Sequence, residues 1–253
     1  MNNKPHYFIQ TGADKQILNQ GCYTAYYGAK SLGYDITLFM NDYQAFENYR
    51  FDVKVPDKIC IGGIDTLRSI FDNLGCAQPE IHFPHNHLPE YLGRKVKEVE
   101  LGELRHNHPI TFPLFIKPLE LDKGFTGYVV KSTVDLIKVR NFPDTTKLFS
   151  SEVVNFVSEY RIFIHDRKII GAKNYVGKFN VIPDFELVEY AINDYKNQKI
   201  AYSLDFGITD QGQTLLIEIN DAFGIAPYGL EPTAYLKMLT ARWQEIMKAK
   251  QEY

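Results

Sequence analysis

The sequence predicts an α+β protein whose N-terminal part is a small α/β unit. Short apolar runs alternate with stretches of helical periodicity over residues 1–78, which is typical of an α/β unit. Prolines then punctuate residues 79–112, and short strands dominate residues 113–253. We therefore expect an N-terminal α/β domain, a linker that leads into the second domain, and a larger C-terminal α+β domain with these boundaries.

The composition excludes several classes of protein. Of the 253 residues, 45% are hydrophobic and 14% are aromatic, which excludes a disordered chain. No apolar stretch approaches the ~20 residues that a membrane-spanning helix needs, and no signal-peptide pattern opens the chain. The formal net charge of −3 leaves room only for a local nucleic-acid groove. Three widely separated cysteines without a CxxC pair argue against a disulfide framework and favour the reducing cytoplasm.

The spacing of apolar residues predicts the N-terminal elements. Strands are expected over 6–10, 35–40 and 58–61, and helices over 17–33 and 65–74. Gly33 closes the first helix and Gly75 follows the second. Residues 62–63, both glycine, join the third strand to the second helix. They lack the other residues of a P-loop or a dinucleotide fingerprint, so a plain turn is favoured over an anion site.

Histidines gather in the proline-rich segment 79–112. Five of the seven lie from His82 to His108, and a short charged strand is expected over 95–101. The triplets 85–87 and 106–108 lack the ligand spacing of zinc sites or of His-Asn-His nucleases, and no cysteine is nearby. Surface or packing roles are therefore favoured over a metal site.

Strands alternate with a few helices in the C-terminal domain. Strands are predicted over 114–117, 128–131, 151–157, 160–165, 168–176, 200–209 and 213–220. Helices are expected over 133–139, over 185–197 with Asp184 as its cap, and over 233–248. A glycine-rich connection, 221–229, precedes the last helix. Contact with a substrate and a simple connection both stay open for it.

The last two predicted strands form a hairpin whose register follows from its apolar residues. With the turn at residues 211–212, one face carries only apolar pairs: Leu204 with Ile219, Phe206 with Ile217, and Ile208 with Leu215. The same register places Asp205 directly opposite Glu218 on the other face. Asn220 lies two residues further along and shares the side of Glu218.

Two carboxylates at cross-strand distance repel each other unless a positive charge neutralises them. Carboxylate and amide oxygens suit Mg²⁺, so we expect Asp205, Glu218 and Asn220 to bind this ion. The alternative is that one acid is protonated, or that both point into water at a sheet edge. The apolar flanking residues favour a central strand, and therefore the metal.

A lysine and a glycine loop upstream have the parts of a polyphosphate site. Lys117 ends the strand 114–117, and the following loop contains Gly124 and Gly127. The ammonium group supplies charge, and the glycines let backbone N–H groups approach phosphate oxygens. Many hairpins carry lysine and glycine, so this interpretation depends on the metal residues downstream.

A second hairpin, with its turn at residues 166–167, is expected between these two sites. Glu159 and Arg161 then share one face of a strand, whereas Lys173 lies opposite Tyr160 on the other face. Arg161 and Lys173 can reach one ligand from the same side only if a bulge shifts the register. Otherwise each is an ordinary solvated charge.

Taken in order, these motifs resemble the ATP-grasp superfamily over residues 110–248. The family pattern is a strand lysine, a glycine loop, a connecting strand, an acid-x-Arg strand, an Asp and a Glu-x-Asn motif. The matching residues are Lys117, Lys123 to Gly127, Glu152 to Val154, Glu159 with Arg161, Asp205, and Glu218 with Asn220. The resemblance implies an ATP-grasp fold, in which two α+β subdomains grip ATP, preceded by a small α/β pre-ATP-grasp domain.

Within the superfamily, the sequence resembles most a divergent clade named for one arginine and two lysines. We match the arginine to Arg161 and the lysines to Lys117 and Lys173. The resemblance implies a bacterial or phage protein. It also implies a relation to the eukaryotic ATP-grasp factor that assembles a translation initiation complex.

The resemblance further implies a role for each residue. Backbone groups of Glu152, Val153 and Val154 would hold adenine, and Glu159 would hold ribose. The phosphates would be bound by Lys117, Lys123, Gly124 and Gly127, and one or two Mg²⁺ ions by Asp205, Glu218 and Asn220. Arg161 or Lys173 would act as the catalytic group that binds the carboxylate or the moving phosphate.

The implied activity is an ATP- and Mg²⁺-dependent ligation of a carboxylate to an amine or a similar nucleophile. The γ-phosphate would activate the carboxylate as an acyl phosphate, on a small molecule, a peptide or a protein. One alternative is an assembly factor that binds ATP and a protein partner without ligation. Another is a bare α/β binding domain whose acids are structural. No membrane partner is expected, nucleic acid is disfavoured, and neither the substrates nor the oligomeric state follow from the sequence.

Overall fold

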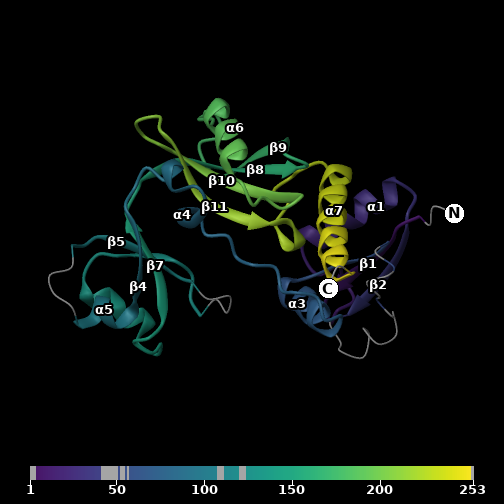
Figure 1. The fold of residues 1–253 in the computed structure, drawn as a ribbon, viewed down its shortest axis with the longest axis horizontal. Helices are drawn as coiled ribbons and strands as arrows, with labels where there is room; N and C mark the ends of the chain where they lie inside the picture. Colours follow the sequence, from purple (N-terminus) through teal and green to yellow (C-terminus); the bar gives the residue numbers. More distant parts are fainter. Residues whose placement is uncertain are drawn as a thin grey trace.

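The computed structural model describes residues 4–40, 51, 55, 57–106, 111–119 and 124–251. Three β-sheets organise this part of the chain, one parallel and two antiparallel. Figure 1 shows the N-terminal sheet at one end of the molecule, the second sheet at the other end, and the third between them. This arrangement agrees with the predicted α+β class and its N-terminal α/β unit.

The N-terminal sheet is parallel, with strand order β2-β1-β3. It consists of β1 (His6–Thr11), β2 (Asp35–Met40) and β3 (Lys58–Ile61), accompanied by α1 (Gln20–Ser31) and α3 (Ile64–Asn73). The predicted order of strands and helices is confirmed. The helix expected from residue 17 begins instead at Gln20, because Asn19 caps it: its side chain accepts a hydrogen bond from the N–H of Cys22.

The last helix of the chain, α7 (Pro232–Gln251), packs against α1 and against the N-terminal sheet. Tyr235 and Trp243 of α7 belong to the same buried cluster as residues of β1, β3 and α3. Phe163, from a strand of the third sheet, also belongs to it. The two ends of the chain therefore share one hydrophobic core. The domain boundaries at residues 78 and 113 stay a prediction.

The second sheet is antiparallel, with strand order β4-β7-β5-β6. Its strands are β4 (Val96–Glu100), β5 (Leu114–Pro118), β6 (Tyr128–Val130) and β7 (Lys147–Glu152). The helix α5 (Leu101–His106) and the 3₁₀ helix Thr133–Val139 contribute to its small apolar core. The proline-rich segment is thus more than a linker: it supplies α4 (Pro84–His87), the 3₁₀ helix Pro89–Tyr91, β4 and α5.

The third sheet is antiparallel, with strand order β11-β10-β8-β9. Its strands are β8 (Phe156–His165), β9 (Lys168–Gly177), β10 (Ala201–Thr209) and β11 (Thr214–Asp221). The helix α6 (Phe185–Asp194) packs on one face and is capped by Asp184 as predicted, although it ends before residue 197. Among the described helices, none is both long and apolar enough to cross a bilayer.

The strand predicted over 151–157 is wrong. β7 ends at Glu152 and β8 begins at Phe156, so residues 153–155 run from the second sheet to the third. Alternating apolar residues continue through this junction, and such alternation does not separate one strand from two strands joined end to end.

A bulge changes part of the register predicted for the β10–β11 hairpin. Asp205 lies opposite Glu218 as predicted, but the register shifts directly after this pair. Phe206 therefore faces Leu216 rather than Ile217, and Ile208 faces Thr214 rather than Leu215, so these two predicted pairs are wrong. The sequence does not reveal the extra residue in β11, because residues 215–217 are all apolar and fit either register.

Bulges also change the register predicted for the β8–β9 hairpin. Its turn is at residues 166–167 as predicted, and both residues have positive φ angles. The register shifts at two points, and the shift between Phe163 and Ile164 places Lys173 opposite Arg161 rather than Tyr160. The predicted separation of Arg161 and Lys173 onto opposite faces is therefore wrong. A bulge shifts the register, so both residues lie on the same face of the sheet.

Candidate functional site

A row of charged side chains crosses one face of the third sheet. Lys173 on β9 lies opposite Arg161 on β8. Arg161 in turn lies opposite Asp205 on β10, and Asp205 lies opposite Glu218 on β11. Directly facing residues in adjacent strands point to the same side of a sheet. The structure therefore brings four predicted site residues together.

Arg161 and Asp205 form a buried bidentate ion pair in this row. Nε donates to Oδ1 at 2.8 Å and Nη2 donates to Oδ2 at 2.7 Å. Burial lowers the pKa of Arg161, but the hydrogen bonds and charge of Asp205 outweigh it, so the net shift is upward. Burial raises the pKa of Asp205, with Arg161 opposing the shift and Glu218 adding to it. The positive charge beside Asp205 is therefore supplied by the protein itself.

The remaining contacts of Arg161 fix the loop that follows β11. Its Nη1 donates to the carbonyl oxygen of Ala226 at 3.4 Å, and its guanidinium lies 4.8 Å from the ring centre of Tyr228. Tyr228 stacks in turn on Tyr175, at 4.8 Å between ring centres. All three guanidinium nitrogens are therefore engaged within the chain. A direct contact of Arg161 with a substrate stays a prediction.

An ion pair joins the second sheet to the charged row. Nζ of Lys117, on β5, lies 2.8 Å from Oε1 of Glu218, on β11. Gly127 packs closely beside Lys117: a Cβ atom added to Gly127 would lie 3.0 Å from the Cβ of Lys117 and 2.6 Å from the ring of Phe115. The loop before β6 can therefore approach β5 this closely only with glycine at this position.

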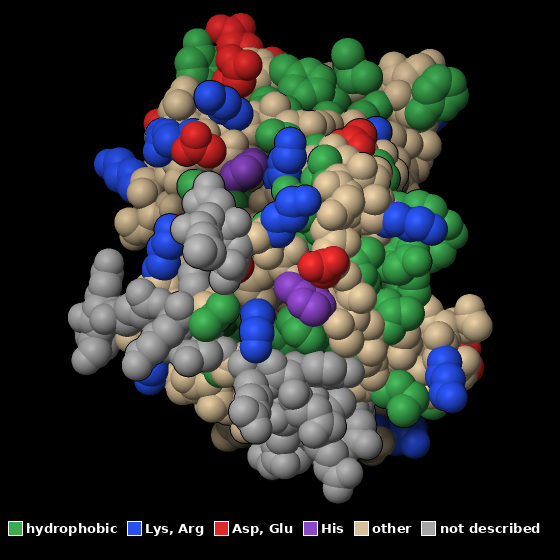
Figure 2. Space-filling view, turned by 90° about the vertical axis from the view of Figure 1, so that its right-hand side faces the viewer, with side chains coloured by type: hydrophobic (Ala, Val, Ile, Leu, Met, Phe, Trp, Pro, Cys, Tyr) green, Lys and Arg blue, Asp and Glu red, His purple; other side chains and the backbone are tan. Residues whose placement is uncertain are grey.

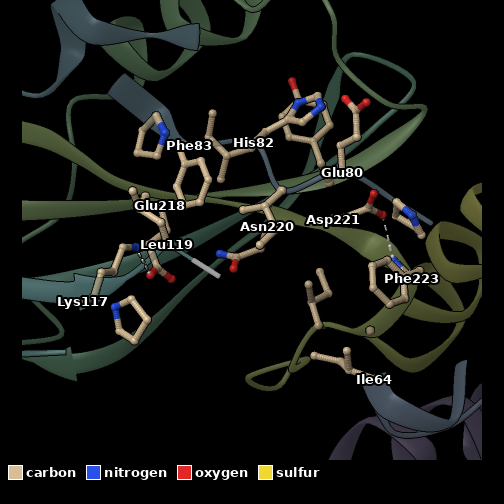
Figure 3. A pocket seen from close by; sticks show the side chains of 18 of the residues that line it. Ile64, Glu80, His82, Phe83, Lys117, Leu119, Glu218, Asn220, Asp221 and Phe223 are labelled. Atoms are coloured by element: carbon tan, nitrogen blue, oxygen red, sulfur yellow. Dashed lines mark hydrogen bonds and ion pairs between the residues drawn. The ribbon is translucent and has the colours of Figure 1, made fainter. Parts of the chain in front are cut away.

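A cavity of about 500 Å³ opens beside this ion pair. Its walls come from β5 and the loop before β6, from β11 and the loop after it, from α3 and from the segment 79–84. Four predicted site residues line it: Lys117, Gly127, Glu218 and Asn220. Figure 3 shows Asn220 between the Lys117–Glu218 pair on one side and Phe223 and Ile64 on the other.

Glu218 and Asn220 offer the oxygen ligands that Mg²⁺ prefers. The amide of Asn220 points into the cavity, and its Nδ2 is buried without a hydrogen-bond partner among the described residues. Turning the amide over presents Oδ1 at the same place. The cavity wall therefore fits a divalent cation held by these two residues. Asp205 shares their face but is already paired with Arg161, and no three His, Cys, Asp or Glu side chains converge in the described part of the chain.

The residues predicted to hold adenine lie where the second and third sheets meet. Glu152 ends β7, and its Oε2 accepts a hydrogen bond from the N–H of Lys95 at 3.0 Å. Val153 is exposed and Val154 is half-buried. None of these three residues lines the cavity. Their backbone therefore lies at the connection between the sheets, and contact with adenine stays a prediction.

Of the other residues predicted to bind the nucleotide, the structure describes Glu159 and Gly124. Glu159, on β8, lies opposite Gly207 and faces the same side as Arg161 two residues later. Gly124 is exposed and lies beside the ring of Phe142. Lys123 lies outside the described residues.

The segment 79–84 forms a cavity wall that the sequence analysis treats as a linker. His82 is buried, and its Nδ1 hydrogen-bonds the hydroxyl of Tyr195 directly after α6. Its ring also stacks on that of His87, at 4.3 Å. Burial lowers the pKa of His82 to about 4, and the positive charge of Lys199 adds to the shift. The clustered histidines were a signal, but their spacing does not show which one turns inward.

The loop after β11 is held against the cavity by residues that the sequence analysis missed. Both carboxylate oxygens of Asp221 accept hydrogen bonds from Arg242 of α7, each at 2.7 Å. Oδ1 of Asp221 also accepts one from the N–H of Phe223. Phe223 lines the cavity together with its two following neighbours. This placement favours substrate contact over a simple connection for part of the loop 221–229.

Comparisons with known proteins bear on the fold. A family model for an ATP-grasp domain, family 2 of the clade named for one arginine and two lysines, matches residues 91–238. No curated protein matches the chain. Among solved structures, D-alanine–D-alanine ligase from Bacillus anthracis complexed with ATP is similar over 98% of this chain and 99% of that chain, with a TM-score of 0.57 at 14% identity.

Two further solved structures have the same overall arrangement. The match to N5-carboxyaminoimidazole synthetase from Staphylococcus aureus covers 95% of this chain and 78% of that chain, with a TM-score of 0.61 at 10% identity. The match to VanG D-Ala:D-Ser ligase from Enterococcus faecalis covers 98% of this chain and 99% of that chain, with a TM-score of 0.58 at 15% identity. At these identities the likeness concerns the fold alone. Together with the family model, it confirms the ATP-grasp fold expected from the sequence.

Proposed function

Because this chain belongs to family 2 of the arginine-and-two-lysine clade of ATP-grasp domains, we propose that it is an ATP- and Mg²⁺-dependent ligase. It joins a carboxylate to an amine or a similar nucleophile. A carboxylate oxygen attacks the γ-phosphorus of ATP, which forms an acyl phosphate and releases ADP. The nucleophile then attacks the acyl carbon and loses a proton as phosphate leaves. The acyl donor is a small molecule, a peptide or a protein.

One observation carries this proposal: Lys117 and Glu218 meet at 2.8 Å beside a cavity of about 500 Å³. The lysine suits phosphate oxygens, and the carboxylate suits a divalent cation. A magnesium-bound polyphosphate offers each of them its preferred partner, because it carries both charges. Mg-ATP can therefore replace the ion pair without leaving either side chain unpaired.

In the proposed reaction Lys117, the backbone near Gly127, and Lys123 and Gly124 bind the phosphates. Glu218 and Asn220 hold Mg²⁺, with Asp205 beside them. When bound, this ion offsets the negative charge that develops on the transferring phosphoryl group.

The rest of the charged row supports this arrangement. Arg161 forms the buried ion pair with Asp205 and holds the loop after β11. Lys173, the last residue of the row, is suited to bind the carboxylate or the moving phosphate. For the adenosine part of ATP, we propose the backbone of 152–154 and the carboxylate of Glu159.

Similar structures support the class of reaction. Two of them are named as ligases of D-alanine, one of these is complexed with ATP, and a third is named as a synthetase. We extend to this chain only ATP as the nucleotide and ligation as the reaction class. The substrates of those proteins are not carried over.

The test measures ADP, phosphate and a covalent product together. The protein is incubated with Mg-ATP and with pools of carboxylates and amines, and the products are followed by mass spectrometry. We expect ADP and phosphate in equal amounts to one new adduct, and no turnover by Glu218→Gln. Stable ATP binding with no turnover in any extract, together with a co-purifying protein, would favour the alternative function, that of an assembly factor that binds ATP and a protein partner without ligation.

The proposed partners are therefore ATP and a carboxylate-bearing substrate. Figure 2 shows one face of the molecule on which lysine and arginine side chains are scattered among hydrophobic and acidic ones rather than gathered into a stripe. This scatter supports the proposal of no nucleic-acid partner on that face. A cytoplasmic location, a bacterial or phage source and a relation to the eukaryotic factor stay predictions.

A further inference from the structure

The cavity extends well beyond the residues assigned to Mg-ATP. Past Asn220 its walls are formed by the first half of α3, the segment 79–83 and the loop after β11. The family model begins at residue 91, so nothing in that match assigns α3 or the segment 79–83. This outer part of the cavity is therefore a binding site without an assigned ligand.

Arg68 of α3 is the oriented cation of this outer part. Its guanidinium lies 5.7 Å from the ring centre of Phe223, and its Nη1 makes one long hydrogen bond, 3.5 Å, to Oε1 of Gln78. Gln78 is held in turn by the carbonyl oxygen of Arg68 and by Asp72. Phe223 is fixed by the edge-on ring of Phe71 and by Asp221. The position of the guanidinium is therefore set by neighbours on two sides.

Most of the hydrogen-bonding capacity of Arg68 is unused. Among the described residues it makes no ion pair, and its Nε and Nη2 have no hydrogen-bond partner. The other cavity cations differ: Lys117 is paired with Glu218, and Lys199 is a point charge without a planar fork. A half-buried planar guanidinium with two free nitrogens is the group that binds a carboxylate in bidentate geometry.

Apolar side chains surround this position. Ile64 and Ile81 line the cavity and are 42% and 39% exposed, so their apolar side chains are accessible to a ligand there. Asp65 and Glu80 also line it, and neither has an ion-pair partner among the described residues. The two acids make a doubly charged phosphate group less suitable than a singly charged carboxylate.

We propose that the outer cavity binds the carboxylate-bearing substrate of the ligase. Arg68 binds its carboxylate, which leaves the moving phosphate to Lys173, while Ile64, Ile81 and Phe223 pack against its apolar body. The ligand class is therefore a small amphipathic carboxylate. This inference rests on the proposed function, because it places the carboxylate-bearing substrate in the same cavity as Mg-ATP.

The test uses two probes of the same shape, 4-methylpentanoate and its uncharged amide. Each is titrated by calorimetry and by ligand-observed NMR into the full chain saturated with Mg²⁺ and a non-hydrolysable ATP analogue. We expect saturable binding of the acid with a Kd of about 1 mM, and binding of the amide weaker by at least about tenfold. Arg68→Gln should lose a similar factor for the acid, whereas Arg68→Lys should bind with an intermediate affinity.

The matched control is Arg140→Gln, which removes an exposed arginine from the end of the second sheet's 3₁₀ helix and should bind the acid like the wild type. Equal affinities for acid and amide, wild-type affinity in Arg68→Gln, or no binding of either probe to the analogue-saturated protein would overturn the inference. If Arg68→Gln does not fold, Arg68→Lys decides by the same criterion. Failure of the ATP analogue itself to bind counts against the proposed function instead, which separates the two.

Discussion

Lys117 and Glu218 are 101 residues apart in the sequence, yet Nζ of the first lies 2.8 Å from Oε1 of the second. The pair connects β5 of the second sheet to β11 of the third at the edge of the cavity. Each side chain thereby neutralises the other. Mg-ATP has to exchange both partners at once, so nucleotide and metal are expected to bind cooperatively.

Removing the lysine should affect ATP and metal in opposite directions. In Lys117→Met we expect the affinity for ATP to fall at least about tenfold, because a charge-assisted contact to phosphate is lost. The affinity of the nucleotide-free protein for Mn²⁺, used as a paramagnetic substitute for Mg²⁺, should rise because the positive charge of Lys117 beside Glu218 is removed. Calorimetry and electron paramagnetic resonance measure the two values. Lys131→Met, at an exposed lysine after β6, should change neither.

Gly127 should tolerate no side chain. In Gly127→Ala the new Cβ would lie 2.6 Å from the ring of Phe115 and 3.0 Å from the Cβ of Lys117, so the Phe115 ring must move and Lys117 must give way. We expect a loss of about 1–3 kcal/mol in the free energy of unfolding and weaker ATP binding. Gly63→Ala is the matched control, because its nearest atom would lie at 3.5 Å. Equal ATP affinities in the two variants would contradict the placement of this loop.

The buried Arg161–Asp205 pair should be essential to stability. In Asp205→Asn the charge of Arg161 stays buried without its carboxylate, which we expect to cost roughly 3 kcal/mol in the free energy of unfolding. Denaturant unfolding followed by circular dichroism measures this. Asp210→Asn, in the exposed hairpin turn, should change stability by less than about 0.5 kcal/mol. If both substitutions lower the free energy of unfolding by a similar, small amount, the ion pair between Asp205 and Arg161 does not stabilise the fold.

His82 should make the protein less stable in mild acid. Burial lowers its pKa to about 4, below the 6.5 of an unfolded chain, so the unfolded state binds more protons between these values. Stability contributed by neutral His82 is complete above pH 6.5 and is lost as the pH falls to 4, by up to about 3 kcal/mol. Lys199, His87, Glu80 and Asp221 act on the same ring, and Tyr195 hydrogen-bonds it. An NMR titration of His82 with its midpoint at about 6 or higher would contradict this prediction.

Much of the site is local in sequence and could therefore be predicted. Asp205 faces Glu218 because a short hairpin places them opposite each other, and alternation fixes which face they share. The turn at 166–167 and the cap at Asp184 likewise depend on neighbouring residues only. The bulges were missed, because an extra residue in one strand leaves the apolar pattern readable in either register.

The contacts that complete the site are not local. Arg161 pairs with Asp205 because β8 lies beside β10, an order that hydrophobic periodicity does not encode. Lys117 reaches Glu218, and α3 with the segment 79–84 closes the cavity, only through the packing of separate sheets and helices. The packing of α7 into the N-terminal core likewise joins residues far apart in the sequence.

The central claim is that the cavity between Lys117 and Asn220 binds magnesium and ATP together. Titration of a non-hydrolysable ATP analogue by calorimetry, with and without Mg²⁺, into the wild type and Glu218→Gln tests it most directly. The account predicts binding at one site in the wild type, strengthened by Mg²⁺, and loss of this strengthening in the variant with its fold intact. The same affinity in both proteins, or no binding to the wild type, would contradict it.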